Sequence, residues 1–282
     1  MMPRLSRIAI YPVKSLNPIY VDEVKVLESG ALENDRCFAL WDEQNKFVNG
    51  KREPKVHHLR LTQFGKEGLT LDSHLGELVV DWVEDPEISD VVTESYLKEF
   101  FGYRVTLYPN PAVAEPPGNP GFPDDLELGG PTLVSSASLK TVSDWFGGLP
   151  YEETWLRFRA NLEIDDVPAF WEDQLYTADR EQGIPFTIGR IPFLGMNPCA
   201  RCVVPTRHPE TGETIAGFAK TFRTERERTL PEWAERERFD HYFRLALNTI
   251  LNTDELMAPT TIYPQLILKV GDEIAITPHG DR

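Results

Sequence analysis

The chain contains 282 residues, with 29 Lys and Arg against 45 Asp and Glu, so its formal net charge is −16. A surface of that sign repels phosphate backbones, which disfavours a nucleic-acid partner. No apolar run approaches the roughly 20 residues of a membrane-spanning helix, so no membrane partner is expected. The three cysteines, Cys37, Cys199 and Cys202, are too few for a disulfide framework or a four-thiolate iron–sulfur cluster. We therefore expect a reducing, cytoplasmic setting.

The first part of the chain reads mainly as short strands. Alternating apolar and polar residues predict strands over residues 8–11, 21–27, 37–41 and 78–82, and residues 42–45 predict a hairpin turn. A helix is expected over Thr93–Phe101, with Thr93 as its N-cap and Gly102 as its stop. A further strand is predicted over residues 103–108.

A dense cluster of proline and glycine over residues 109–131 predicts a linker or a long connection between two halves. After it, Ser136 or Ser138 could cap a helix. The apolar stripe of this helix, which we interpret as core, consists of Leu139, Val142, Trp145 and Phe146.

The rest of the second half offers fewer elements. Residues 224–240 are rich in Glu and Arg and predict a solvated helical face. Strands are expected over residues 266–270 and 273–276.

Residues 156–162 alternate apolar and polar side chains and predict a strand. On such a strand Arg157, Arg159 and Asn161 would project from one face. Two guanidinium groups and an amide make a good receptor for an anion or a polar heterocycle. An exposed strand face that pairs with the many acidic residues explains the same spacing.

A second basic cluster lies near the N-terminus. Lys14 and Ser15 follow the first predicted strand, and Arg36 precedes the third. A lysine, a hydroxyl, backbone N–H groups and an arginine are what a terminal phosphate needs. Such residues are also common at strand ends, where they favour solubility.

The Cys-x-x-Cys sequence of Cys199 and Cys202 is open to four interpretations. A structural zinc site normally needs four ligands, and only His208 lies near in sequence. A thioredoxin-like dithiol should precede a helix, whereas this pair precedes a strand-like segment. The pair could also be two buried thiols, or one of them could bind a soft metal that has other ligands from a cofactor. Cys37 lies in an apolar run and is interpreted as packing.

Other histidines are weaker candidates. His57 and His58 are adjacent in a predicted strand entrance, so they face opposite sides and do not share a metal. His208 lies in a predicted turn.

Taken in order, several blocks of this sequence resemble the molybdenum cofactor sulfurase C-terminal (MOSC) family. The nearest branch by these motifs is the bacterial and mitochondrial amidoxime-reducing proteins. Any one block is weak, but the ordered set spans most of the chain. The blocks are Tyr11–Ser15, Gly30 with Asp35–Arg36, Phe47–Pro54, Leu133–Leu139, Arg157–Asn161, and Cys199–Cys202 continuing to Thr206 and Pro209–Gly212.

The resemblance implies a mainly β fold with some helices (α+β). An N-terminal β-barrel-like domain over residues 1–108 would pack against a MOSC β-barrel domain over residues 132–282, with 109–131 as the connection. It also implies the molybdenum cofactor, a single pterin-bound molybdenum, between the two domains.

By motif position, the resemblance implies that Cys202 is the thiolate ligand to the metal. Lys14, Ser15 and Arg36 would hold the pterin phosphate, while Arg159 and Asn161 would contact the pterin. Ala200 and Arg201 would lie against the cofactor. Arg157 and Cys199 are motif neighbours without an assigned role.

The sequence departs from the family pattern just before Leu133. Relatives often have an acidic residue followed by a hydroxyl residue there, whereas this chain has Gly129 and Gly130 and then Thr132. Hydrogen bonds from this segment would come from backbone or from Thr132, and an acidic group near the metal is not expected.

The resemblance implies an oxidoreductase that reduces small N-hydroxylated substrates, N–OH to N–H. Electrons would come from a separate iron–sulfur or flavin protein. Two other classes compete with this hypothesis. One is a cofactor carrier or sulfur-transfer module without turnover of its own, and the other is a small zinc or thiol-redox protein.

Overall fold

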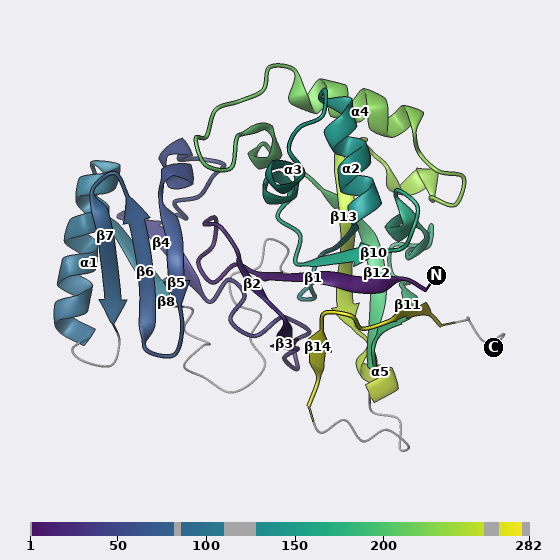
Figure 1. Cartoon of the computed structure of the whole chain (residues 1–282), viewed down its shortest axis with the longest axis horizontal. Helices are drawn as coiled ribbons and strands as arrows, with labels where there is room; N and C mark the ends of the chain where they lie inside the picture. Colours follow the sequence, from purple (N-terminus) through teal and green to yellow (C-terminus); the bar gives the residue numbers. More distant parts are fainter. Residues whose placement is uncertain (1, 82–85, 110–127, 257–264, 278–282) are drawn as a thin grey trace.

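The computed structural model describes residues 2–81, 86–109, 128–256 and 265–277. Within these ranges the protein is mainly β, with fifteen strands and five α helices, which confirms the predicted α+β class. A large sheet, its helices and the two-stranded sheet β3-β14 form one half, and two further small sheets with one long helix form much of the other (Figure 1).

The eight-stranded sheet has the order β15-β11-β12-β13-β9-β10-β1-β2. Strand β1 (Arg4–Ile10) pairs with β10 (Leu162–Asp165) on one side and with β2 (Ile19–Val21) on the other. The start of the chain therefore completes a sheet built mostly from the second half. The remaining strands of this sheet are β9 (Leu133–Ser135), β11 (Ile184–Ile188), β12 (Ile191–Ala200), β13 (Arg244–Leu251) and β15 (Ile274–Ile276).

Helices cover one face of this sheet (Figure 1). They are α2 (Ser136–Trp145), α3 (Tyr151–Phe158) and α4 (Phe218–Arg228). Aromatic rings fill the space beneath them, and they include Phe158, Phe222 and Phe243. The expected apolar stripe of α2 is core, because Leu139 and Val142 are fully buried. A short helix, α5 (Thr253–Leu256), follows β13.

The sheets β4-β8 and β5-β6-β7 share a separate buried cluster that contains Leu71 and Leu97. Helix α1 (Pro86–Phe101) packs beside a three-stranded sheet in the order β5-β6-β7 (Figure 1). The strands on this side are β4 (Phe38–Asp42), which pairs with β8 (Val105–Pro109), and β5 (Arg60–Phe64), β6 (Gly68–Ser73) and β7 (Gly76–Asp81). Strand β3 (Glu23–Lys25) pairs with β14 (Ile267–Lys269), and Val24 and Leu268 of this pair pack in the buried cluster of the large sheet.

The short 3-10 helices are η1 (Pro54–His58), η2 (Trp171–Gln174), η3 (Val204–Thr206) and η4 (Arg236–Arg238). The predicted turn over residues 42–45 is confirmed, because Asp42 accepts hydrogen bonds from the N–H groups of Gln44 and Lys46. Gly102 ends α1 as predicted, with φ +84.

Two predicted helix starts are wrong. Helix α1 begins at Pro86, so Thr93 is buried inside it and is not its N-cap. The N-cap of α2 is Ser135, whose Oγ accepts the N–H of Ser138 at 3.1 Å. The helix is therefore capped by the residue that ends the preceding strand, Ser135, and not by Ser136 or Ser138.

The strand predicted over residues 156–162 is also wrong. Helix α3 ends at Phe158, and the chain becomes a strand only from Leu162. Arg157 is therefore a helical residue, and Arg159 is the C-cap with a left-handed backbone. The helix is hard to recognise from the sequence, because only two of its four buried residues, Trp155 and Phe158, are apolar, and the Arg-x-Arg alternation resembles a strand.

The Glu- and Arg-rich segment is only partly a solvated helix. Helix α4 begins at Phe218 and ends at Arg228, before most of the predicted range. Its Arg226 is buried and forms an ion pair with Asp173. The guanidinium lies 4.1 Å from the ring centroid of Phe170, so this arginine belongs to the core.

Some expectations fall on residues outside the described ranges. They are Trp82 and residues 110–127 of the predicted connection. The division at residues 108 and 132 stays a prediction. Within the described ranges, no helix combines the length and the apolar character that membrane crossing requires.

A buried carboxyl predicts an unusual dependence of stability on pH. Glu172 is 1% exposed, and burial next to Asp173 raises its pKa to about 7. The unfolded chain releases this proton near pH 4.3. The folded protein therefore binds more protons between these values, and its stability should fall as the pH rises through this window.

We expect Glu172→Gln, which stays neutral, to flatten this fall. The measurement is the free energy of unfolding from urea titrations at about pH 5 and about pH 8. Glu227→Gln, on the exposed face of α4, is the matched control and should keep the wild-type slope. An unchanged slope in Glu172→Gln would contradict the assignment.

Candidate functional site

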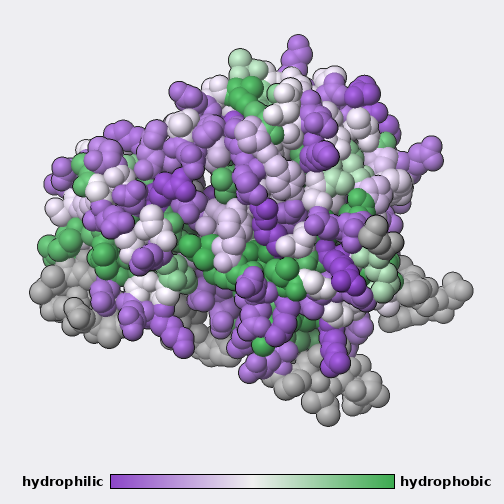
Figure 2. Space-filling view, in the orientation of Figure 1, coloured by the Kyte–Doolittle hydropathy of each residue, from purple (hydrophilic) through white to green (hydrophobic). Residues whose placement is uncertain are grey.

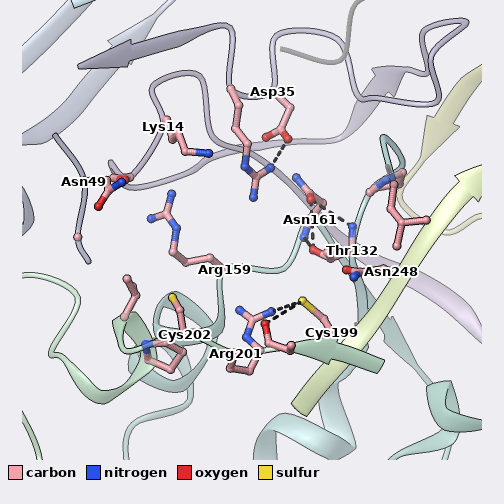
Figure 3. A pocket seen from close by; sticks show the side chains of 18 of the residues that line it. Lys14, Asp35, Asn49, Thr132, Arg159, Asn161, Cys199, Arg201, Cys202 and Asn248 are labelled. Atoms are coloured by element: carbon pink, nitrogen blue, oxygen red, sulfur yellow. Dashed lines mark hydrogen bonds and ion pairs between the residues drawn. The ribbon is translucent and has the colours of Figure 1, made fainter. Parts of the chain in front are cut away.

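A cavity of about 710 Å³ lies between the two halves (Figure 3). A volume of this size suits a ligand as large as a cofactor. The cavity brings together every residue that we assigned to a cofactor from the sequence. These residues are Lys14, Ser15, Arg36, Arg159, Asn161, Ala200, Arg201 and Cys202.

The cavity wall is strongly basic although the protein is acidic. Asp35 is the only carboxylate among the described lining residues. Figure 2 shows mostly hydrophilic side chains on the outer face. Positive charge gathered in a concave site attracts an anion even when the net charge is −16. The basic lining residues are Lys14, Arg36, Lys51, Arg157, Arg159, Arg201 and Arg244.

Tyr11, directly after β1, holds two of these arginines in place. Its ring is fully buried, and the guanidinium carbons of Arg36 and Arg159 lie 5.2 and 4.3 Å from its centroid. Its N–H donates to Asp35 at 2.7 Å, and Asp35 forms an ion pair with Arg36. Its hydroxyl donates to the carbonyl of Ala160 at 3.0 Å. Burial raises the pKa of Tyr11, so the phenol remains protonated and keeps this donor.

Three assigned residues have a left-handed backbone that non-glycine residues rarely adopt. The φ angles are 78° at Ser15, 52° at Arg36 and 52° at Arg159. Each such residue costs free energy, and strain of this kind gathers at functional sites. At Arg159 the conformation ends α3, and the side chain donates to the carbonyl of Leu16 at 2.6 Å. The strained backbone at these three residues therefore fixes the direction of their side chains.

The two cysteines of the Cys-x-x-Cys sequence have different surroundings. Cys199, in β12, accepts a hydrogen bond from Arg201 at 3.0 Å. Cys202 lies just after β12 in the cavity wall, and its sulfur has no hydrogen-bond partner among the described residues. A thiol in that position is available to a soft metal. Within the described ranges, no group of three or more His, Cys, Asp or Glu is placed so that it could hold a metal ion.

Cys37, by contrast, is a packing residue. It is buried, and its sulfur contacts the carbonyl oxygens of Pro12 and Asn34. Burial raises the pKa of this thiol to about 12. It therefore remains protonated at neutral pH.

Asn161 lines the cavity, but its side chain is used by the protein. Its Nδ2 donates to the carbonyl of Ala9 at 3.1 Å. Its Oδ1 accepts hydrogen bonds from the N–H and the hydroxyl of Thr132, both at 3.2 Å. Asn161 thus joins β1 to Thr132 and holds the cavity wall.

The segment with the two glycines lies tightly against β13. Gly130 donates to the carbonyl of Thr249, and the Thr249 hydroxyl donates to Pro131. A Cβ on Gly130 would lie 2.3 Å from the carbonyl oxygen of Thr249, so only glycine fits. The departure from the family pattern therefore has a packing reason, and this wall offers backbone groups and Thr132 in place of a carboxylate.

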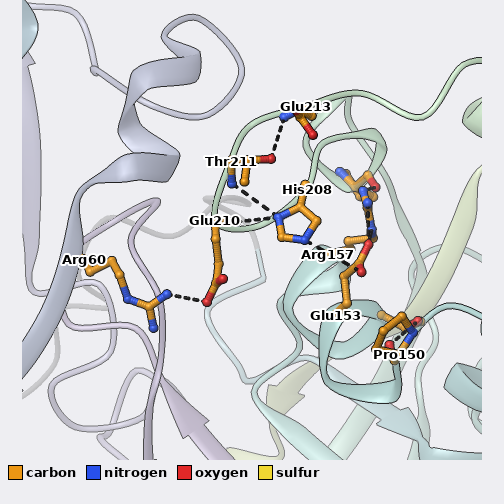
Figure 4. Close-up of polar contacts among 10 residues, drawn as sticks. Arg60, Pro150, Glu153, Arg157, His208, Glu210, Thr211 and Glu213 are labelled. Atoms are coloured by element: carbon orange, nitrogen blue, oxygen red, sulfur yellow. Dashed lines mark hydrogen bonds and ion pairs between the residues drawn. The ribbon is translucent and has the colours of Figure 1, made fainter. Parts of the chain in front are cut away.

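The segment after Cys202 is fixed to both halves (Figure 4). Arg157 is buried and donates to Glu153 and to the carbonyl of Pro205 at 3.0 Å. Further along, Glu210 forms an ion pair with Arg60 of β5. These contacts hold the cysteine loop between α3 and the N-terminal half.

The histidines differ in part from expectation. His208 lies in a turn as predicted, and its Nδ1 accepts the N–H groups of Glu210 and Thr211 (Figure 4). His57 and His58 lie in the 3-10 helix η1, so the strand prediction is wrong there. His57 lines the cavity, and burial lowers its pKa to about 4. It is therefore neutral at physiological pH.

Sequence reasoning missed several polar lining residues. Asn49 and Lys51 lie inside a recognised block, and Asn197 lies two positions before Cys199, so proximity to the motifs could have found them. Arg244 and Asn248 lie on β13, which carries no motif, and only strand pairing brings them to the cavity.

The arrangement around Tyr11 makes a direct prediction. Tyr11→Leu removes the ring that orients Arg36 and Arg159, so affinity for inorganic pyrophosphate should fall at least about tenfold. Tyr11→Phe loses one hydrogen bond, costs about 1 kcal/mol of stability and should keep the affinity. Isothermal titration calorimetry measures both.

The matched control is Tyr176→Leu, because Tyr176 is also buried beneath an arginine, Arg238, but does not line the cavity. It should lose stability and keep wild-type affinity. Equal loss of affinity in Tyr176→Leu would show that Tyr11→Leu acts only through destabilisation.

No curated protein sequence matches the chain. Among solved structures, the YUAD protein from Bacillus subtilis is 12% identical, with a TM-score of 0.37 over 97% of this chain and 94% of that one. A protein from Bordetella bronchiseptica with a solution structure is 11% identical, with a TM-score of 0.29 over 38% of this chain and 92% of that one. Scores this low support no argument.

Family models give a clear result. The model described as the MOSC N-terminal beta barrel domain matches residues 2–93, and the model described as the MOSC domain matches residues 131–275. The two matches cover most of the chain and include every residue that we assigned to the cavity. The chain therefore belongs to the MOSC family, whose domains are associated with molybdenum cofactor binding.

Proposed function

We propose that this chain is a molybdenum-cofactor-dependent oxidoreductase that reduces N-hydroxylated compounds. The observation that carries the proposal is a single cavity that combines a basic cluster, polar walls and a thiol without a hydrogen-bond partner among the described residues. The basic cluster suits a phosphate, the polar walls suit a polar heterocycle, and the thiol suits a soft metal.

The residues of the cavity fit the cofactor. Lys14, Ser15 and Arg36 would hold its phosphate, with Arg36 oriented by Asp35 and Tyr11. Arg159 would lie against the pterin, while Asn161 would act through Thr132. Ala200 and Arg201 would form the wall next to the metal, and Cys202 would bind the metal through its thiolate.

When bound, the cofactor supplies a metal that accepts an oxygen atom from the substrate and is regenerated by two electrons. The overall reaction takes an N–OH group, two electrons and two protons, and it gives an N–H group and water. The electrons would come from a separate iron–sulfur or flavin protein.

The chain itself positions the reacting groups. Arg157 fixes Pro205 and so limits the movement of the loop that carries Cys202. Asp35 is bound to Arg36 and to the N–H of Tyr11, which leaves no unbound carboxylate among the described lining residues. We therefore assign proton delivery to solvent water and not to a side-chain carboxylate.

The second candidate is a cofactor carrier or sulfur-transfer module. The observation that favours it is the same lack of a carboxylate near Cys202 among the described lining residues. The two candidates differ in turnover. A carrier would release its cofactor readily to an apo-enzyme and would reduce no substrate.

The proposal predicts that Cys202→Ala loses both molybdenum and activity. Protein expressed in a host that makes the cofactor should contain close to one molybdenum per chain, and the variant should contain little. Metal content is measured by mass spectrometry, and activity by reduction of a hydroxylamine or an N-hydroxylated base with an artificial electron donor.

Cys37→Ser is the matched control, because a serine can keep both contacts to backbone carbonyls and Cys37 lies outside the cavity. It should retain molybdenum and activity. Unchanged activity in Cys202→Ala would remove the proposal, while molybdenum that exchanges freely without any reduction would favour the carrier.

A further inference from the structure

Two asparagine side chains meet in the cavity wall across neighbouring strands. Asn197 of β12 and Asn248 of β13 are register partners, and the Nδ2 of Asn248 donates to the Oδ1 of Asn197 at 2.9 Å. The register shifts between Gly195 and Asn197, which is the mark of a β-bulge. Bulges near binding sites turn side chains to new directions.

This amide pair keeps unused hydrogen-bonding capacity. After the mutual bond, Asn248 retains its carbonyl oxygen and one N–H, and Asn197 retains its Nδ2 donors. None of these groups has a partner among the described residues, although Asn248 is only 9% exposed. Asn161, in contrast, uses both ends of its amide within the protein. Both side chains line the cavity, and Asn197 is partly exposed there, so the unused groups are open to a ligand.

The pair lies at the end of the cavity opposite the basic cluster. In Figure 3, Lys14, Arg159 and Cys202 lie toward one side, and Asn161, Thr132 and Asn248 toward the other. Arg244, on the same strand as Asn248, already has hydrogen-bond partners, because its guanidinium donates to Asp240 and to the carbonyl of Pro198. This end therefore offers neutral donors and acceptors and suits a neutral polar group better than a phosphate.

We propose that the Asn197–Asn248 pair recognises the amino–oxo edge of the cofactor's heterocycle and so selects a 2-amino-4-oxo ring system. This inference rests on the proposed function. In the cofactor, the phosphate and the metal-binding sulfurs belong to one end of the ring system and the amino–oxo edge to the other, which matches the division of the cavity. The edge places N–H donors next to a carbonyl acceptor, and an amide is complementary to that pattern. The outward-facing groups include a donor and an acceptor in either assignment of the two amides.

The test uses small probes on the cofactor-free full chain. The probe is 6-hydroxymethylpterin, and the matched probe is the corresponding lumazine, in which an oxo group replaces the 2-amino group. Binding is followed by quenching of the probe's fluorescence. We expect the wild type to bind the pterin at least about tenfold more tightly than the lumazine, because the 2-amino group would donate to the Asn248 carbonyl, whereas the 2-oxo group of the lumazine places an acceptor oxygen there.

Asn248→Leu should weaken pterin binding at least about tenfold and abolish the preference over lumazine. Its affinity for inorganic pyrophosphate should not change, because the basic cluster lies at the other end. Asn248→Ala, which also removes the amide and introduces no charge, repeats the test if the leucine variant folds poorly. Asn252→Leu, just after β13 and outside the cavity, is the control and should bind as the wild type does.

Each outcome separates this inference from the proposed function. Pterin binding by Asn248→Leu equal to wild type overturns the inference, and so does a wild type that does not distinguish pterin from lumazine. Either result leaves the proposed function intact if molybdenum still depends on Cys202. A wild type that binds pyrophosphate but acquires no molybdenum and no pterin overturns both.

Discussion

The site depends on the burial of Tyr11 between two arginines. Arg36 comes from the N-terminal part of the chain and Arg159 from the end of α3, and each guanidinium lies within 5.2 Å of the same ring. Two like charges so close would repel each other in the absence of compensation. The electron-rich face of the ring and the Asp35 carboxylate supply it. Because β1 pairs with β10, the same strand that leads into Tyr11 also joins the two halves.

The charge distribution follows from this arrangement. The chain has a net charge of −16, but its acidic residues lie mostly outside the cavity. Asp35 is the only carboxylate among the described residues that line the cavity. A dissolved anion is repelled at long range, yet salt screens that repulsion beyond about 8 Å. Within the cavity the arginines determine the sign of the electrostatic potential, which is positive. Such a site favours a tightly held anionic group over weak binding of many anions.

Constrained backbone at several positions helps to fix the walls of the cavity. Ser15, Arg36 and Arg159 occupy left-handed conformations, and Gly130 touches the backbone of Thr249. Preorganised groups of this kind lose little entropy when a ligand binds. At the neutral end of the cavity, strand pairing and a mutual hydrogen bond position the Asn197–Asn248 pair.

The sequence by itself determined the mainly β class and the identity of most of the basic and thiol residues, because short motifs such as Tyr11–Ser15 and Cys199–Cys202 are local in the chain. It did not determine where those residues lie. Local periodicity misassigned Arg157 to a strand, since a helix of two turns with only two buried apolar residues does not reveal its period. The role of Asn161 as a wall residue and the presence of Asn248 in the cavity came from the pairing of distant strands. Such pairing joins residues far apart in sequence, so only the tertiary structure could decide it.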